Sequence, residues 1–162
     1  MLLTLHAVAH WMWKQRIPLL PRLLSLFNRI VFATQLPAET QLGRGVKLNY
    51  SGLGTVIHAR ALIGNRVEIG SGVVIGGRSE IYEVPVIEDD VLIGVGAKVL
   101  GPVRVGRGAT IGANAVVLHD VPPGAVVVGI PARILRMREM PPGQTEMGQT
   151  EMDQTGMSDT GT

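Results

Sequence analysis

The chain has 162 residues, 46% of them hydrophobic and only 4% aromatic, with no cysteine and a formal net charge of +2. This length suits one domain with a sizeable core. The absence of cysteine excludes disulfides, thiolate metal ligands and thiol nucleophiles. The scarcity of aromatic residues argues against a stacking surface for nucleic acid, so we expect no nucleic-acid partner.

No motif in the chain indicates a bound metal ion or a nucleotide-binding loop. The sequence has no cluster of metal-ligating residues, no P-loop and no dinucleotide-binding glycine motif. No apolar run reaches the roughly 18 residues that span a bilayer. The apolar N-terminal segment lacks the small-residue cleavage site of a signal peptide. We therefore expect a cytoplasmic protein without a metal site.

Residues 1–35 are predicted to form a helical cap. One helix is expected around Leu2–Lys14, with His6 and His10 facing solvent or a helix partner. Pro18 and Pro21 break it from a second amphipathic helix that begins at Pro21. The first 33 residues carry four basic side chains and no acid, so the segment could touch an anionic membrane surface. We favour a packed cap with a solvated basic face.

Residues 36–136 carry a six-residue repeat. Every sixth residue from Ile57 to Val117, eleven positions in all, is Ile or Val, and Ala, Val or Ser follows four residues later at ten of them. This period fits neither an α-helix nor a half-buried strand. It predicts short strands joined by tight turns into triangular coils, a parallel β-helix in which residues 18 apart stack. Ile57 is then expected to lie in one row with Ile75, Ile93 and Ile111.

Two segments interrupt the repeat and are candidates for function, because loops on a rigid scaffold often carry it. An earlier coil runs through leucines at 36, 42 and 48, and the next hexad position is nine residues on, at Ile57. This slip of three predicts a bulged loop in residues 49–54. The second segment, residues 76–85, keeps the period but places Tyr82 and Pro85 in poor positions.

Residues 137–162 are predicted to be a disordered polar tail. The segment has a net charge of −4, against +6 for residues 1–136, and repeats Gly-Gln-Thr-Glu-Met at 143–147 and 148–152. It has too little apolar surface to offset the entropy lost on ordering.

The hexads, with the segments Ile87–Lys98 and Val121–Arg133, resemble the hexapeptide-repeat acyltransferases. Within that family the chain is similar to serine acetyltransferases and to related O-acetyltransferases of surface-polysaccharide gene loci. The resemblance covers roughly residues 5–136. It implies a left-handed β-helix, a homotrimer, and acetyl-CoA bound in a groove between neighbouring subunits.

The acceptor side departs from serine acetyltransferases. The Asp-His pair of that group corresponds here to Asn49 and Tyr50. Its second His, which follows an Arg in the extended loop, corresponds to Val84, and that Arg corresponds to Glu83. An Asp near the start of the β-helix corresponds to Thr34. We therefore expect a sugar hydroxyl in surface-polysaccharide synthesis as the acceptor. The alternatives are a serine O-acetyltransferase with a relocated catalytic base, and a non-enzymatic β-helix scaffold.

His58 is the candidate general base, because a hydroxyl needs a base to take its proton and an imidazole titrates near neutral pH. His58 stands where other hexads carry glycine, and we expect it to lie in one row with Gly76, Gly94 and Gly112. Such a row would be a groove with open backbone N–H groups. The alternatives are a histidine bonded to the 49–54 loop, or a hydrogen-bond donor only. Tyr50 and Asn49 are the other catalytic candidates, and Tyr50 either orients the acceptor or packs. His119 and Glu83 are expected to be ordinary surface residues.

The remaining candidates concern the acyl donor. The resemblance carries the family's backbone contacts with acetyl-CoA to Val95 and Ala113, and places Gly76 and Gly77 near the thioester. Arg133 and Arg136 either meet the phosphates of acetyl-CoA or are plain surface charges.

Overall fold

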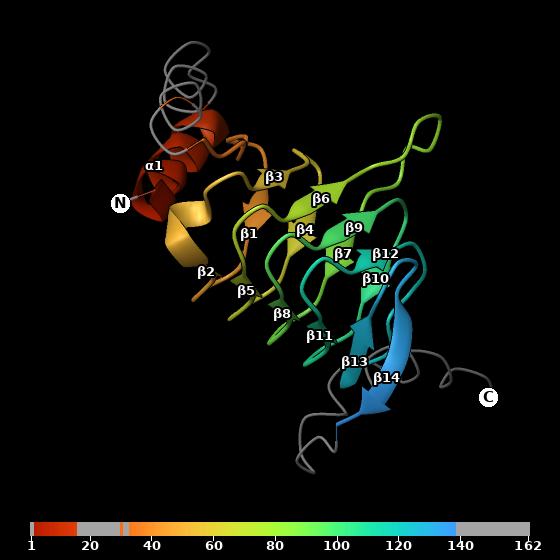
Figure 1. Ribbon diagram of the computed structural model, residues 1–162. Coiled ribbons are helices and arrows are strands. Elements are labelled where there is room, and N and C mark those ends of the chain that lie inside the picture. The colour runs from red at the N-terminus through yellow and green to blue at the C-terminus, as the bar shows by residue number, and fades with distance from the viewer. Residues whose placement is uncertain (1, 16–29, 31–32, 139–162) are drawn as a thin grey trace, which may run out of the picture.

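The structure, a computed structural model, describes residues 2–15, 30 and 33–138. The second predicted helix and the predicted tail beyond residue 138 lie outside these residues. The helix predicted around Leu2–Lys14 is confirmed as α1 (Leu2–Lys14). Figure 1 shows α1 at one end of a solenoid of strands and the strands β13 and β14 at the other.

The strands lie on three faces of the solenoid. The first face holds β1 (Gln41–Leu42), β4 (Leu62–Ile63), β7 (Val86–Ile87) and β10 (Arg104–Val105). The second holds β2 (Lys47–Leu48), β5 (Glu68–Ile69), β8 (Leu92–Ile93), β11 (Thr110–Ile111), β13 (Ala125–Val128) and β14 (Arg133–Met137). The third holds β3 (Val56–Ile57), β6 (Val74–Gly76), β9 (Lys98–Leu100) and β12 (Val116–Val117).

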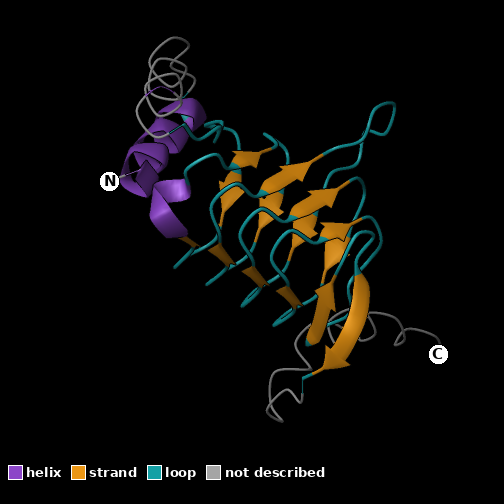
Figure 2. Ribbon diagram, viewed as in Figure 1, coloured by secondary structure: helices purple, strands orange, loops and turns teal. Residues whose placement is uncertain are grey.

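All strand pairs within the faces are parallel except the closing pair of β13 and β14, which is antiparallel. Figure 2 shows these short strands stacked in register, with turns and loops at the corners. This arrangement confirms the predicted left-handed parallel β-helix of hexapeptide repeats.

The interior of the solenoid is built from the two apolar positions of the hexad. The residues at the Ile/Val position from Ile57 to Ile75 and from Ile87 to Val117 are at most 4% exposed. So are their apolar partners four residues later, such as Val67, Ala97 and Ala115, whereas Ser79, the partner of Ile75, lies exposed in the extended loop. Each buried Ile or Val stabilises the fold by about 1.5–3 kcal/mol. A single narrow core therefore runs along the axis.

The predicted row of Ile57, Ile75, Ile93 and Ile111 is wrong at the step from Ile75 to Ile93, whereas Ile93 does pair with Ile111. Ile57 does pair with Ile75, but Ile75 pairs with Val99, and Ile69 pairs with Ile93. The coil that follows Ile75 is six residues longer because residues 77–84 leave the solenoid as an extended loop (Figure 1). Ile81 sits in that loop and is 38% exposed. An insertion of one whole hexad leaves the sequence period unchanged, so the period alone could not reveal it.

The bulge predicted in residues 49–54 is confirmed. Leu48 pairs with Ile69, so this coil contains three extra residues, which form the short 3-10 turn η1 (Asn49–Gly52). Tyr50 and Ser51 adopt positive φ angles of 51° and 55° there. The hydroxyl of Thr34 donates a 2.7 Å hydrogen bond to the carbonyl of Gly52 and holds the bulge against the coil below.

Helix α1 packs on the first coil. Leu2 joins the hydrophobic core, and Nδ1 of His10 lies 2.7 Å from the carbonyl oxygen of Ala38. The prediction that His6 faces solvent is wrong, because His6 is only 4% exposed, and His10 is half-buried against Ala38. The alternative, contact with the second predicted helix, falls outside the described residues. No described helix is long and apolar enough to cross a membrane.

Candidate functional site

The predicted site residues lie along two opposite edges of the third face. We call the edge where its strands begin the leading edge, which comprises residues 49–54, 70–73, 94–97 and 112–115. We call the edge where they end the trailing edge, which comprises residues 58–61, 76–85, 101–103 and 118–120. The two edges are separated by the length of strands such as β9.

The structure does not bring His58 into one row with Gly94 and Gly112. His58 lies on the trailing edge, where its N–H donates a 2.8 Å hydrogen bond to the carbonyl of Ile75, directly before Gly76. Gly94 and Gly112 lie on the leading edge with Asn49 and Tyr50. The prediction of a single glycine groove below His58 is therefore wrong. The prediction failed because it assumed that residues 18 apart always stack. The coil after Ile75 has 24 residues, so Gly94 falls on a different corner from Gly76.

His58 is half-buried, and its ring forms one hydrogen bond with the described residues. Its Nδ1 accepts the backbone N–H of Arg60 at 3.2 Å. A backbone N–H can only donate, so Nδ1 is the acceptor and the neutral ring carries its hydrogen on Nε2. The alternative prediction, that the His58 ring is hydrogen-bonded to the 49–54 loop, is wrong for the described residues, because no such bond is present.

The glycines of the leading edge are required by packing. A Cβ on Gly94 would lie 2.6 Å from the backbone nitrogen of Ala113, because the next coil sits directly on it. The N–H groups of Gly94 and Gly112 donate to the carbonyls of Ile111 and Val127 at 2.8 Å each. The expectation that these two N–H groups are open to a ligand is therefore wrong.

The residues that follow these glycines present the free donors instead. Among the described residues, no backbone carbonyl accepts the N–H of Val95 or of Ala113. The two residues lie one coil apart, since the N–H of Asn114 donates to the carbonyl of Val95 at 2.9 Å. Val95 is 47% exposed. Two adjacent unpaired donors suit the amide groups of a long, thin ligand that lies along the edge.

Arg133 lies beside this leading edge. It pairs in register with Val128, whose side chain lies above Gly112. Its guanidinium donates a 3.1 Å hydrogen bond to the carbonyl of Ala132 and is otherwise exposed. Arg136 lies three residues further along β14, opposite Val126. Arg133 is therefore the nearer of the two to Ala113.

Gly76 and Gly77 on the trailing edge are not required by packing. A Cβ on Gly76 would meet Leu100 at 3.6 Å, and one on Gly77 would meet Val84 at 3.5 Å, both ordinary contact distances. Neither residue has a positive φ. Their lack of side chains therefore has no explanation within the described fold, in contrast to Gly94.

The extended loop projects from the trailing edge beside His58. Its residues 78–83 are exposed, and the ring of Tyr82 lies under the guanidinium carbon of Arg60 at 3.7 Å from the ring centroid. Arg60 is not among the candidates predicted from the sequence. The only signal was the poor hexad position of Tyr82, which reflects its place in the loop. Tyr50 is exposed on the opposite edge and does not meet His58 within one chain.

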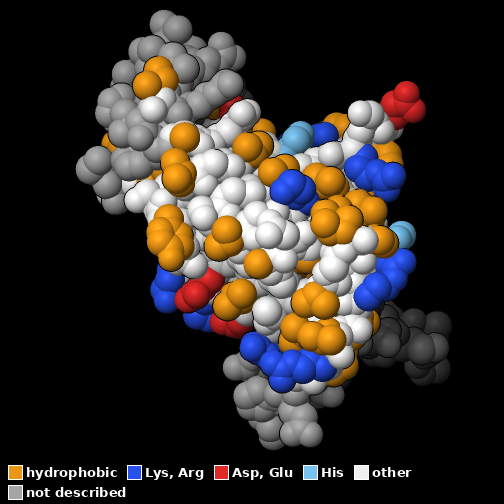
Figure 3. Space-filling view, viewed as in Figure 1, with side chains coloured by type: hydrophobic (Ala, Val, Ile, Leu, Met, Phe, Trp, Pro, Cys, Tyr) orange, Lys and Arg blue, Asp and Glu red, His pale blue; other side chains and the backbone are white. Residues whose placement is uncertain are grey.

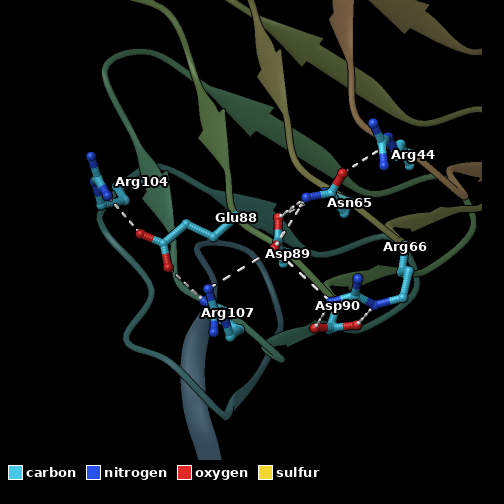
Figure 4. A network of polar contacts seen from close by, with 8 residues as sticks. All are labelled: Arg44, Asn65, Arg66, Glu88, Asp89, Asp90, Arg104 and Arg107. Carbon is cyan, nitrogen blue, oxygen red and sulfur yellow. Dashed lines mark hydrogen bonds and ion pairs between the residues drawn. The ribbon is translucent and has the colours of Figure 1, made fainter. Parts of the chain in front are cut away.

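A ladder of polar groups lies at the third corner, between the first and second faces (Figure 4). Oδ1 of Asp89 accepts the N–H of Asn65 at 2.8 Å, and Asp90 accepts two hydrogen bonds from Arg66 at 2.6 and 2.7 Å. The bond from Asn65 lowers the pKa of Asp89, and the bond from Arg66 lowers the pKa of Asp90. These groups satisfy one another, so we assign the ladder to stability.

The described residues contain no group of three or more His, Asp or Glu side chains that could hold a metal ion. Figure 3 shows exposed hydrophobic side chains spread over the visible face, with basic side chains both among them and along the margins.

The chain is similar to proteins of known activity over most of its length. Residues 85–119 match the family described as bacterial transferase hexapeptide (six repeats). The serine acetyltransferase of Synechococcus elongatus is 40% identical over 135 residues, which are 82% of this chain and 55% of that protein. The serine acetyltransferase of Mycobacterium tuberculosis is 39% identical over 140 residues, which are 85% of this chain and 61% of that protein.

Solved structures give the same result. Serine acetyltransferase from Brucella abortus superposes with a TM-score of 0.79 at 36% identity, covering 85% of this chain and 56% of that one. Soybean serine acetyltransferase complexed with serine superposes with a TM-score of 0.78 at 38% identity, covering 83% of this chain and 56% of that one. The chain thus spans less than two thirds of the length of these relatives.

Proposed function

We propose that this chain, which matches the bacterial hexapeptide-repeat transferase family over residues 85–119 and is similar to serine acetyltransferases, transfers an acetyl group from acetyl-CoA to a hydroxyl group. The observation that carries the proposal is the similarity to serine acetyltransferases over more than 80% of the chain. The unpaired N–H groups of Val95 and Ala113 support it, because they suit the amide-bearing arm of acetyl-CoA.

We propose serine, or a compound like it, as the acceptor. Similarity to several serine acetyltransferases, one of them solved with serine, supports this acceptor over the sugar hydroxyl expected first from the sequence. A sugar acceptor remains the second candidate because of one observation. Thr34, where serine acetyltransferases are expected to carry an acid, is fully buried and bonded to the carbonyl of Gly52, so it cannot meet a substrate.

The division of the candidate residues between two edges supports a site shared between copies of the chain. Val95, Ala113, Tyr50 and Arg133 lie on or beside one edge, and His58 lies on the other. A homotrimer, as the resemblance implies, would set the leading edge of one copy against the trailing edge of the next. In that arrangement the donor groove and His58 would meet.

In this site we propose that His58 takes the proton of the attacking hydroxyl while its oxygen bonds to the thioester carbon. Because Nδ1 accepts the N–H of Arg60, Nε2 carries the hydrogen in the neutral ring. The base role therefore requires this bond to open when the acceptor binds, so that one nitrogen is free to take a proton. The C–S bond then breaks and the thiol of CoA leaves with a proton. Gly76 and Gly77 leave room for the thioester beside His58.

The test is release of CoA thiol by the purified protein with L-serine, and in parallel with nucleotide sugars and oligosaccharides. Turnover with serine supports the proposed acceptor, and turnover with a sugar alone supports the second candidate. Absence of acetyl-CoA binding in calorimetry would overturn the transferase proposal and favour a scaffold.

A further inference from the structure

Arg60 connects two segments of the trailing edge, the turn at residues 58–61 and the extended loop at residues 77–84. Its backbone N–H donates to Nδ1 of His58 at 3.2 Å, and its guanidinium carbon lies 3.7 Å from the centroid of the Tyr82 ring. The first contact belongs to the turn that carries His58, and the second reaches a residue of the extended loop. Arg60 therefore contacts the His58 ring through its backbone and the extended loop through its charged group.

The guanidinium of Arg60 has no carboxylate partner among the described residues. The ion pairs between described residues lie away from the trailing edge and are formed by other basic residues, namely Lys47, Arg66, Arg104 and Arg107. Glu80 and Glu83 are in the same loop as Tyr82, but neither forms an ion pair with Arg60. Arg60 and Tyr82 are both exposed, and Tyr82 is 77% exposed.

Stacking on an aromatic ring restricts a guanidinium without consuming its hydrogen bonds. The ring covers one planar side of the group, while the N–H donors lie in the plane at its rim. These donors match the two oxygens of a carboxylate or a phosphate. Because the side chain is already held, less entropy is lost when an anion binds.

We propose that Arg60, supported by Tyr82, binds an anionic group of the acceptor and so presents the acceptor hydroxyl to His58. The anion is a carboxylate, as in serine or an acidic sugar, or a phosphate, as in a nucleotide-linked sugar. This inference rests on the proposed acetyl transfer, and it assigns the recognition of the acceptor to a residue outside the candidates that the sequence suggested. It also explains how a site with Glu83 and Val84 in the loop can still hold an anion.

The test compares acceptors with and without the anion in wild type, Arg60→Ala, Arg60→Lys, Tyr82→Phe and Tyr82→Leu. The pairs are L-serine with serinol, and glucuronate with glucose. Arg60→Ala retains the backbone N–H that bonds His58, so it removes only the guanidinium. Arg44→Ala is the matched control, since Arg44 is exposed at the third corner and its hydrogen bonds to Asn65 and Arg66 are made by its backbone alone.

We expect Arg60→Ala to raise KM for the anionic acceptor at least about tenfold, with a smaller change in kcat. Activity toward the neutral analogue should not change. Arg60→Lys should recover part of the affinity, Tyr82→Phe should resemble wild type, and Tyr82→Leu should weaken the anionic acceptor only. The Arg44→Ala control should resemble wild type. Equal losses with anionic and neutral acceptors, or no loss with either, would overturn the inference.

Calorimetric titration separates this inference from the proposed function. If wild type turns over no acceptor, binding of L-serine, glucuronate and inorganic phosphate to wild type and to Arg60→Ala is measured directly. Binding that Arg60→Ala abolishes supports the anion site although the transferase proposal has failed. No binding of any of the three to wild type overturns the anion site. Circular dichroism of each variant verifies that the β-helix is intact.

Discussion

Nδ1 of His58 accepts the backbone N–H of Arg60 at 3.2 Å, two residues further along the same turn. The bond orients the imidazole and makes Nε2 the protonated nitrogen of the neutral ring. The same ring can then act in two ways. It donates from Nε2 while the bond persists, and it takes a proton once the bond opens.

Two substitutions of His58 distinguish these roles. Alanine removes both, whereas glutamine retains an N–H donor but cannot take a proton. If His58 is the base, kcat should fall by about 10²–10⁴ in His58→Ala and to a similar extent in His58→Gln. The measurement is kcat for thiol release across pH. A His58→Gln enzyme that keeps most of its activity would show that His58 is only a donor.

Gly94 and Gly76 should respond in opposite ways to alanine. Gly94→Ala places a Cβ 2.6 Å from the backbone nitrogen of Ala113, so we expect a loss of about 1–3 kcal/mol in the free energy of unfolding. Gly76→Ala meets only Leu100 at 3.6 Å and should change stability by less than about 0.5 kcal/mol.

If Gly76 leaves room for the thioester, Gly76→Ala should still lower kcat/KM by about tenfold. Urea unfolding measures stability, and thiol release measures activity. Full activity in a stable Gly76→Ala protein would remove Gly76 from the proposed site.

The polar ladder at the third corner should make stability sensitive to acid. The pKa values of Asp89 and Asp90 are lowered from 3.8, by the N–H of Asn65 and by Arg66 respectively. A lowered carboxyl pKa contributes stability that is present above the unfolded value and is lost as pH falls through the folded value. We therefore expect the urea midpoint to decline below about pH 4.

The matched variant for the ladder is Asp89→Asn, which retains an oxygen acceptor for the N–H of Asn65 but cannot titrate. The decline of its urea midpoint with acid should be shallower than that of wild type. An identical decline in both proteins would show that Asp89 does not contribute.

His6 should make the packing of α1 depend on pH. Burial lowers its pKa from 6.5, with a smaller contribution from His10. A lowered histidine pKa means that stability is complete above the unfolded value and is lost as pH falls below it, because the folded state resists protonation. Both tryptophans of the chain, Trp11 and Trp13, lie on α1, so their fluorescence reports on this helix.

We expect α1 to become less stable in urea between about pH 7 and pH 5 in wild type, and this dependence to weaken in His6→Gln. Trp fluorescence at several urea concentrations measures it. A pH dependence that survives unchanged in His6→Gln would assign it to another group.

Much of the fold could be predicted from the hexads, since burial on a narrow three-sided core imposes Ile or Val at every sixth position. The slip of three between Leu48 and Ile57 likewise identified the bulge at 49–54. The insertion after Gly76 could not be located as a longer coil, because six extra residues preserve the phase. The predicted groove below His58 was wrong for this reason. The contact between Arg60 and Tyr82 joins residues whose spacing follows no repeat.

The sequence by itself determined the solenoid, its core and the candidate His58, because the hydrophobic repeat is a local property that each coil imposes on its own residues. Only the tertiary structure decided which coils stack on which, since parallel pairing between coils depends on the length of every intervening loop. It therefore decided that His58 and the unpaired N–H groups of Val95 and Ala113 lie on opposite edges of one face. It also decided that the guanidinium of Arg60 lies on the ring of Tyr82, because a loop of one coil folds back onto the turn that carries His58.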